Sequence, residues 1–215
     1  MLATEAQVAA LVAVFRKGTK LTYKKGEYII RPGESPNGVF YIESGLVKAF
    51  NISKYGEENL LIMRSEHEIF PLIWAVTGEE REIIYQAIGP TVAWRVPRED
   101  FIKYLEKHQD ALPPLLDMSI EMYRRHSERI FNLEYRTVRE RLVSYLLYMA
   151  ERFGRQTKDG LIIDAPLRHQ DIASSINSSR ETTSRELAYL ERKGYVSSSS
   201  SLVTILDKDK LHAFL

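Results

Sequence analysis

The stretch from Leu167 to Val196, LRHQDIASSINSSRETTSRELAYLERKGYV, decides how the C-terminal part of this chain folds. Apolar side chains recur in it at helical spacing in two segments: Leu167, Ile172, Ala173 and Ile176, then Thr183, Leu187 and Leu190. Asn177 stands between the segments, where a tight turn between two helices often needs a left-handed residue. Ser178 or Ser179 can cap the second helix, so the stretch predicts a helix-turn-helix.

The second helix carries a polar face whose members follow the helical period: Arg180, Glu181, Ser184 and Arg185. Arginine forks onto O6 and N7 of guanine, a carboxylate accepts from N4 of cytosine, and a serine hydroxyl serves either role. The face therefore predicts a helix that reads base edges in a DNA major groove. The alternative is a solvated, charged face in an ordinary helical pair.

The residues after the second helix predict a wing. Gly194 follows Lys193 at a helix stop position, and the segment from Leu202 to Leu206 has the branched residues of a strand. Ser197 to Ser201 lie between these elements. Such a hairpin can rest on DNA phosphates, or its serine-rich tip can be flexible and have no role.

The quoted residues resemble the family of the cyclic-AMP receptor protein and the fumarate-nitrate regulator. Two segments carry the resemblance: Arg168 to Ala173, RHQDIA, and Ser179 to Leu187, SRETTSREL. It implies a bacterial transcription regulator with an N-terminal sensor roll and a C-terminal winged helix. In both branches of the family, the residues that contact DNA bases match residues of this sequence. The resemblance therefore implies a palindromic site that contains a GA step. The DNA-contacting set expected from the residues and the resemblance is Arg180, Glu181, Ser184, Arg185, Ser179, Thr182, Arg168, His169, Gln170 and Lys193.

Composition limits the other classes of protein. The 215 residues include 44% hydrophobic residues, enough for two domains, and no cysteine, which excludes disulfides and cysteine-ligated iron–sulfur clusters. The net charge of +1 means that any basic surface must be local. We find no signal segment and no apolar run of about 18 residues, so we expect a cytoplasmic protein without membrane contact.

The first hundred residues predict an antiparallel β-roll, because short apolar runs alternate with glycine- and proline-rich turns. The runs are Tyr28–Arg31, Val39–Ile42, Leu46–Phe50, Asn59–Met63, Ile83–Ala87 and Val92–Val96. Pro97 precedes a short acidic helix start. We therefore expect an α+β protein with an antiparallel β-roll over residues 1–109. The resemblance implies that this roll is similar to a cyclic-nucleotide-binding domain, that residues 110–135 form a dimerisation helix and that residues 136–215 form a winged-helix DNA-binding domain.

The nucleotide-binding segment that the resemblance implies departs from the family pattern. Relatives that bind cyclic AMP place a Gly-Glu pair after a phenylalanine, whereas Pro71-Leu72 follows Phe70 here. Proline lacks the backbone donor, and leucine cannot accept a hydroxyl proton. Arg81 matches the phosphate-binding arginine, but Glu82 stands beside it and would repel a phosphate. We predict that cyclic AMP and cyclic GMP do not bind.

Two interpretations of the roll interior stay open. Leu72, Trp74, Arg81 and Tyr85 can line an aromatic pocket for a small anionic effector, because arginine pairs well with carboxylates. Alternatively the pocket is filled and its apolar members are core residues, which is the commoner fate of such residues. By resemblance, His126 and Ser127 lie where relatives contact the nucleotide, or they face solvent or a second copy of the chain.

The segment 110–135 predicts a long helix with Asp110 as its cap and Pro113-Pro114 in its first turn. Its apolar residues form an extended face: Leu115, Leu116, Met118, Ile120, Met122, Tyr123, Ile130, Phe131 and Leu133. In the family this helix pairs with its twin as a parallel coiled coil, which implies a homodimer. A second helix is expected from Thr137 to Phe153, with the hinge between Leu133 and Thr137.

These patterns predict a sequence-specific, homodimeric transcription regulator whose partners are double-stranded DNA and, by resemblance, RNA polymerase. The alternative is an effector-binding signalling module whose winged helix contacts proteins. The sequence contains no metal-ligand cluster, nucleophile elbow or phosphate loop, so we expect no enzyme activity, no metal and no cofactor.

Overall fold

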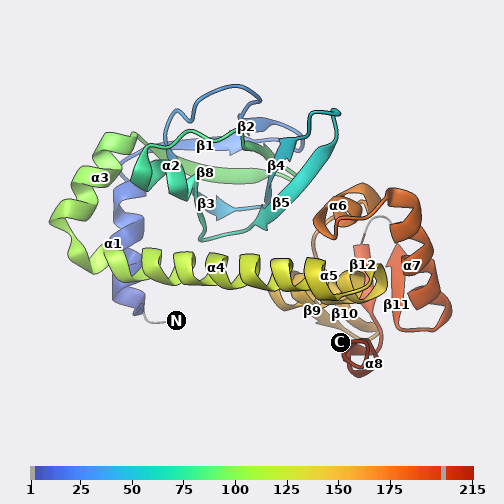
Figure 1. The fold of residues 1–215 in the computed structure, drawn as a ribbon. Helices are drawn as coiled ribbons and strands as arrows, with labels where there is room; N and C mark the ends of the chain where they lie inside the picture. Colours follow the sequence, from blue (N-terminus) through green and yellow to red (C-terminus); the bar gives the residue numbers. More distant parts are fainter. Residues whose placement is uncertain (1–2, 200–201) are drawn as a thin grey trace. The chain divides into compact units, whose positions relative to one another are not determined.

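The computed structural model describes residues 3–199 and 202–215. Its fold is α+β, as predicted, and the chain forms two compact units (Figure 1). One unit comprises Met1–Asn51 and Leu61–Arg125, and the other comprises Ile52–Leu60 and His126–Leu215. The division therefore lies within the long helix, upstream of the hinge expected from the sequence, and a hairpin tip of the roll belongs to the second unit.

Two four-stranded antiparallel sheets form the roll, in the orders β1-β8-β3-β6 and β2-β7-β4-β5. The strands are β1 (Thr19–Tyr23), β2 (Tyr28–Ile30), β3 (Val39–Ser44), β4 (Val47–Ile52), β5 (Glu58–Arg64), β6 (Ile69–Phe70), β7 (Ile84–Ala87) and β8 (Thr91–Val96). Six of these correspond to the predicted runs, whereas β1 and β6 were not predicted.

Strand β3 is buried on both faces and divides the roll core into two hydrophobic clusters. Successive side chains of a strand point to opposite faces. Val39 and Tyr41 therefore enter one cluster, in which Phe15 lies 5.5 Å from the Tyr41 ring. Phe40 and Ile42 enter the other cluster. The double burial fixes the register of β3, because a shift by one residue would exchange the two sets.

The helices of this part are α1 (Glu5–Phe15), α2 (Leu72–Thr77), α3 (Arg98–Lys107) and α4 (Leu112–Tyr135), with a 3-10 turn at Gln109–Ala111. Helices α1 and α2 were not predicted. The acidic start of α3 and the prolines in the first turn of α4 agree with the prediction. Asp110 is not the cap of the long helix, because it lies inside the 3-10 turn, and α4 begins two residues later.

Helix α4 presents an apolar seam to solvent in the single chain. Leu116, Ile120, Tyr123 and Ile130 are all exposed, at spacings of four, three and seven residues. Ser127 occupies the remaining position of the same heptad pattern and is also exposed. These spacings are those of the a and d positions of a coiled coil.

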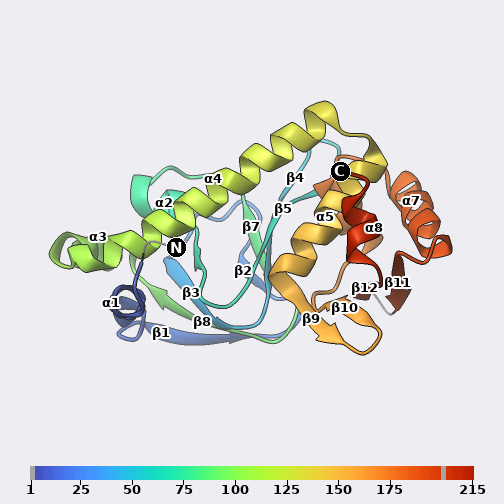
Figure 2. The ribbon, with the colours of Figure 1, turned by 90° about the horizontal axis from the view of Figure 1, so that it is seen from below.

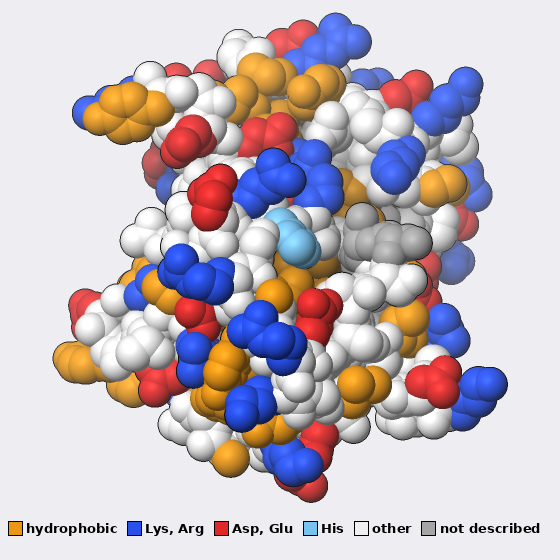
Figure 3. Space-filling view, turned by 90° about the vertical axis from the view of Figure 1, so that its right-hand side faces the viewer, with side chains coloured by type: hydrophobic (Ala, Val, Ile, Leu, Met, Phe, Trp, Pro, Cys, Tyr) orange, Lys and Arg blue, Asp and Glu red, His pale blue; other side chains and the backbone are white. Residues whose placement is uncertain are grey.

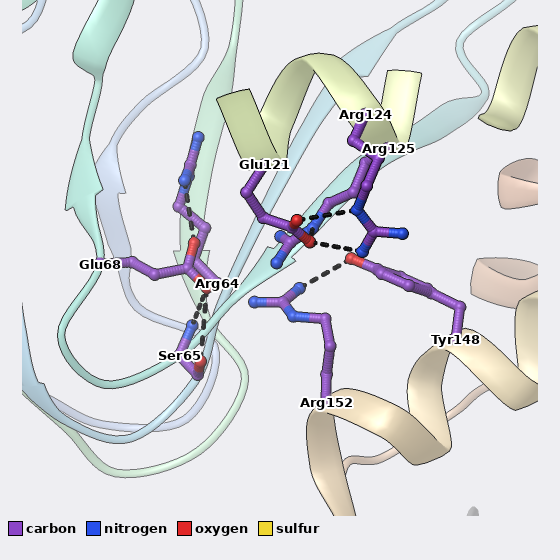
Figure 4. A network of polar contacts seen from close by, with 8 residues as sticks. All are labelled: Arg64, Ser65, Glu68, Glu121, Arg124, Arg125, Tyr148 and Arg152. Carbon is purple, nitrogen blue, oxygen red and sulfur yellow. Dashed lines mark hydrogen bonds and ion pairs between the residues drawn. The ribbon is translucent and has the colours of Figure 1, made fainter. Parts of the chain in front are cut away.

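Two arginines of α4, Arg124 and Arg125, hold the carboxylate of Glu121 on the same helix (Figure 4). They directly follow the seam residue Tyr123. Glu121 accepts from Arg124 Nη2 and Arg125 Nε, each at 2.8 Å. The bond from Arg124 is the main cause that lowers the Glu121 pKa to about 2. Arg124 and Arg125 interrupt the predicted apolar face of this helix, and both are paired with a carboxylate of the same helix.

The second unit contains a four-stranded sheet of order β11-β12-β10-β9 and four further helices. Its elements are α5 (Val138–Phe153), β9 (Gly154–Thr157), β10 (Gly160–Ile163), α6 (His169–Ser175), α7 (Arg180–Arg192), β11 (Val196–Ser199), β12 (Leu202–Ile205) and α8 (Lys208–His212). Thr137 caps α5 in a capping box with Glu140, so this helix begins where predicted. Helix α8 packs beside α5 (Figure 2).

Candidate nucleic-acid interface

The turn between α6 and α7 has the geometry that its sequence predicts. Asn177 has φ of 50°, in the left-handed region. Ser178 N donates to Ala173 O at 2.9 Å and closes the turn. Ser179 then caps α7, because its hydroxyl accepts from Thr182 N at 3.1 Å. Each of these bonds is local, so the form of the turn itself follows from residues within this short segment.

Helix α7 turns its apolar side inward and its predicted reading face outward. Thr183, Leu187 and Leu190 are buried, as expected. Arg180 and Arg185 are exposed, together with the Glu181 carboxylate. Figure 3 shows Lys and Arg side chains spread among acidic, hydrophobic and other groups on the side of the molecule that carries α6 and α7. The face is thus available to a large polar ligand.

One buried hydroxyl of α7 yields a stability prediction. Thr183 is fully buried, and its Oγ has no hydrogen-bond partner among the described residues. Thr183→Val removes this unsatisfied group with little change of volume, so we expect unfolding free energy to rise by about 1 kcal/mol. Urea denaturation measures the change. The control is Thr182→Val, which deletes a hydroxyl bonded to Ser179 and is expected to give no gain. A loss of stability in Thr183→Val would contradict the prediction.

Ser184 differs from the other members of the reading face because its hydroxyl already has a partner. His169 Nδ1, on the first residue of α6, lies 2.8 Å from Ser184 Oγ. Both residues belong to the predicted DNA-contacting set, but their pairing was not predicted. The bond links the reading face of α7 to the start of α6.

Arg168 precedes α6 and is held by two carboxylates of the second unit. It makes a bidentate pair with Asp171 at 2.7 and 2.8 Å, and its Nη2 lies 3.4 Å from Glu58 on β5. The hydrogen bond to Asp171 is the main cause that raises the Arg168 pKa. Asp171 itself is buried, so the pair orients Arg168, whose side chain remains largely exposed.

Two arginines of α5 that the sequence interpretation missed support the helix-turn-helix. Arg139 Nε donates to Glu186 at 2.7 Å, and its guanidinium lies 3.7 Å from the centre of the Tyr189 ring. Arg141 donates to two backbone carbonyls, Arg136 O at 3.0 Å and Asn177 O at 3.3 Å. No local signal indicates the contacts with Glu186, Tyr189 and Asn177, because these partners are distant in sequence from α5.

The wing is an antiparallel hairpin in which Val196 pairs with Ile205 and Ser199 with Leu202. Part of the predicted serine loop, Ser197 to Ser199, is therefore strand and exposed, whereas Ser200 and Ser201 lie outside the described residues. Gly194 has φ of 71° and ends α7 as predicted.

An open hollow of about 630 Å³ lies between the wing and the helix-turn-helix. Its lining consists of Leu167, Arg168, His169, Gln170, Arg180, Ser198, Ser199, Leu202 and Val203. The structure thus brings Arg168, His169, Gln170 and Arg180 together around one depression. The exposed Lys193 lies at the other end of α7, where its Nζ is 5.9 Å from the centre of the Tyr189 ring.

The residues expected around an effector lie in different surroundings. Leu72 belongs to the cluster around Phe15, and Trp74 packs against that same cluster. Tyr85 belongs to the other cluster, where it stacks 4.6 Å from Phe70. Arg81 is exposed in the segment that follows α2. Leu72 and Trp74 therefore lie in one cluster and Tyr85 in another, and the three side chains do not line a common pocket.

His126 and Ser127, the remaining effector candidates, are exposed on α4 in the second unit. Tyr85 has a cationic neighbour that was not predicted: Arg64 on β5, which pairs with Glu68 at 3.0 Å (Figure 4). Burial raises the Tyr85 pKa, and the positive charges of Arg64 and Arg81 act in the opposite direction.

Within the described residues, no group of His, Asp and Glu side chains is arranged to hold a metal ion. None of the described helices combines the length and apolar character that crossing a membrane requires.

Comparison with known proteins agrees with this geometry. Residues 20–108 match the model of the cyclic nucleotide-binding domain, and residues 140–214 match the model of the Crp-like helix-turn-helix domain. The chain is 31% identical to the global nitrogen regulator of Synechocystis sp. over 209 residues, which cover 91% of each chain. It is 30% identical to the global nitrogen regulator of Nostoc sp., covering 86% of this chain and 83% of that protein.

Solved structures share the fold. The FixK2 protein of Bradyrhizobium japonicum has a TM-score of 0.78 at 22% identity, covering 92% of this chain and 96% of that chain. A CRP/FNR-family transcriptional regulator of Thermus thermophilus has a TM-score of 0.70 at 22% identity, with coverages of 91% and 97%. Other relatives are named as transcription regulators, among them the CRP-like cAMP-activated global transcriptional regulator of Mycobacterium tuberculosis, which is 24% identical and covers 94% of this chain and 91% of that protein. The chain belongs to the CRP/FNR family of transcription regulators, and its second unit carries the family's DNA-binding helix-turn-helix.

Proposed function

We propose that the protein regulates transcription as a homodimer that binds a palindromic DNA site containing a GA step, with one α7 helix in each half-site. The observation that carries this proposal is the exposed polar face of α7 with Arg180, Glu181 and Arg185 on it. Two arginines and a carboxylate on one face are suited to G·C pairs, because they offer donors to guanine and an acceptor to cytosine.

The proposed dimer forms through α4. Exposed Leu116, Ile120, Tyr123 and Ile130 would bury their side chains against the same residues of a second copy. Ser127 lies in the same seam, and a polar group there can fix the register at some cost in stability. A two-fold dimer would present two copies of α7 to a palindrome.

We propose distinct contacts for the remaining predicted residues. Arg168, His169 and Gln170 line the hollow with Arg180. This supports phosphate contacts by Arg168 and Gln170 beside the reading face, and a place for His169 at the DNA surface. Ser179 and Thr182 at the start of α7, and Lys193 at its end, would likewise contact the DNA backbone. A DNA ligand implies a cytoplasmic location and RNA polymerase as a partner, and both are part of the proposal.

The test is selection of bound sequences from a random DNA pool, followed by anisotropy titrations with the selected palindrome and with random DNA at one salt concentration. The expected result is saturable binding with a preference for the palindrome. A module whose winged helix contacts proteins would bind neither DNA saturably at moderate salt. Repeating the selection with and without cell metabolites reports whether a small-molecule effector acts.

We further propose that cyclic AMP and cyclic GMP do not control this protein, although the roll matches the cyclic nucleotide-binding domain. Leu72, which stands where relatives place the ribose-binding glutamate, is buried in the core, and Pro71 has no N–H to offer a phosphate. Calorimetric titration is expected to give no heat of binding with either nucleotide, and a cyclic-AMP-binding relative is the positive control. Micromolar binding would overturn the proposal.

The predicted effector pocket of Leu72, Trp74, Arg81, Tyr85, His126 and Ser127 stays a prediction. The burial of Leu72 and Tyr85 in two separate core clusters supports the alternative, in which the interior of the roll is filled.

A further inference from the structure

The hydrogen bond between His169 and Ser184 limits what the Ser184 hydroxyl can offer to DNA. Ser184 lies one helical turn beyond Arg180 on the exposed side of α7, and His169 approaches it from α6 at 2.8 Å. A serine hydroxyl has one proton to donate and lone pairs to accept. An imidazole Nδ1 either donates or accepts, according to where the ring carries its proton.

The two possible directions of this bond leave opposite groups for a base. If the Ser184 hydroxyl donates to Nδ1, only its lone pairs remain, and they accept from N6 of adenine or N4 of cytosine. If Nδ1–H donates to Ser184, the hydroxyl proton remains free for O6 or N7 of guanine, N7 of adenine or O4 of thymine. The partner at position 169 therefore governs the base preference of position 184.

We propose that His169 is a specificity-determining positioning residue, which selects the base read by Ser184 by fixing the orientation of the Ser184 hydroxyl. The inference rests on the proposed function, because it requires α7 to contact base edges. It assigns His169 a role different from that of a phosphate contact. A phosphate contact adds affinity for every sequence, whereas an orienting residue changes the preference at one base pair.

The experiment uses the full-length protein and the selected palindrome, varied to all four base pairs at each half-site position. Ser184→Ala first identifies the position at which discrimination falls. We expect His169→Ala to reduce discrimination at that same position by about 3- to 10-fold, the usual effect of losing one hydrogen bond. The double variant is expected to lose no more than either single variant, because the two residues act as one unit.

Two further variants separate orientation from general loss. His169→Asn keeps a donor and an acceptor near the site of Nδ1 and is expected to restore part of the discrimination. Gln170→Ala, at the next residue of α6, is expected to weaken binding of all four base pairs alike and leave their ratio unchanged. Circular dichroism and thermal unfolding check that each variant is folded.

Each contrary result has a separate meaning. If the unsubstituted protein binds the selected palindrome and random DNA equally, the proposed function and this inference both fail. If the unsubstituted protein discriminates but His169→Ala weakens all four base pairs equally, the inference alone fails. It also fails alone if Ser184→Ala changes no base preference.

Discussion

Replacing Ile120 with aspartate is expected to convert the proposed dimer into a monomer and to reduce affinity for the proposed palindrome by about 100-fold or more. Ile120 is 51% exposed at a central seam position of α4, so the single chain has no need of its side chain for folding. In the dimer, two copies of the aspartate would face each other in an apolar interface, where charge repulsion and desolvation both oppose association. A monomer would bind only one half-site, and it would lose the increase in affinity that two linked binding domains provide, which is commonly 10²–10⁴-fold.

Val76→Asp is the matched control for this change. Val76 is also a helical apolar residue, is 53% exposed, and lies on α2, away from the α4 seam. Val76→Asp should leave unchanged both the mass of the assembly and its affinity for the palindrome. Sedimentation equilibrium gives the oligomeric state, and anisotropy gives the affinity on full and half palindromes. An Ile120→Asp protein that remains dimeric would contradict the proposed interface.

Replacing Arg185 with alanine is expected to cost about 1–3 kcal/mol at the preferred site and to relax discrimination at one base pair. Arg185 is exposed on the outward side of α7, so truncation removes groups that face the ligand and disturbs no core contact. The bidentate fork of arginine explains the size of the effect, because no other side chain satisfies O6 and N7 of guanine together in the same way.

Lys193→Ala provides the comparison, because Lys193 is exposed at the far end of α7. A phosphate contact contributes affinity without sequence preference, so this variant should weaken selected and random DNA alike and reduce the salt slope by about 0.9. Titrations of both variants over a range of salt concentrations measure these effects. Equal losses on selected and random DNA for Arg185→Ala would contradict base reading.

The helix-turn-helix was predictable residue by residue because its signals are local. The left-handed Asn177, the capping Ser179 and the stop at Gly194 each act within a few residues, and each has the predicted conformation. The start of α5 was also predicted to within one residue, and the capping box of Thr137 and Glu140 that fixes it is a local feature as well. A local hydrogen bond or a steric preference determines these features, so the sequence contains the whole cause.

Elements that depend on tertiary packing were not predicted. Helix α1 ends in Phe15, which stacks on Tyr41 and lies tilted against Phe101, two residues far along the chain. A usable signal was present, since Thr4 and Gln7 form a capping box. Strand β1 carries largely exposed side chains and is fixed by pairing with β8, for which its own sequence contains no evidence.

The candidate site shows the same limit. Sequence spacing identified the residues of the reading face but not their partners. His169 and Ser184 are brought together by the crossing of two helices, and Arg139 reaches Glu186 from a third helix. Pairings of this kind depend on how helices cross, and a single sequence does not specify that crossing.

The contacts of Arg141 have a consequence for how the protein tolerates variation in its DNA sites. One guanidinium joins the Arg136 carbonyl, just before α5, to the Asn177 carbonyl in the turn before α7. These two hydrogen bonds connect the turn to the start of α5 and oppose relative movement of the two. Palindromes whose half-sites are one base pair nearer or farther apart would have to be accommodated upstream of Arg136, at the end of α4. Related proteins whose sites have another half-site spacing should accordingly differ from this one at the end of α4, while the segment of α6, turn and α7 keeps its geometry.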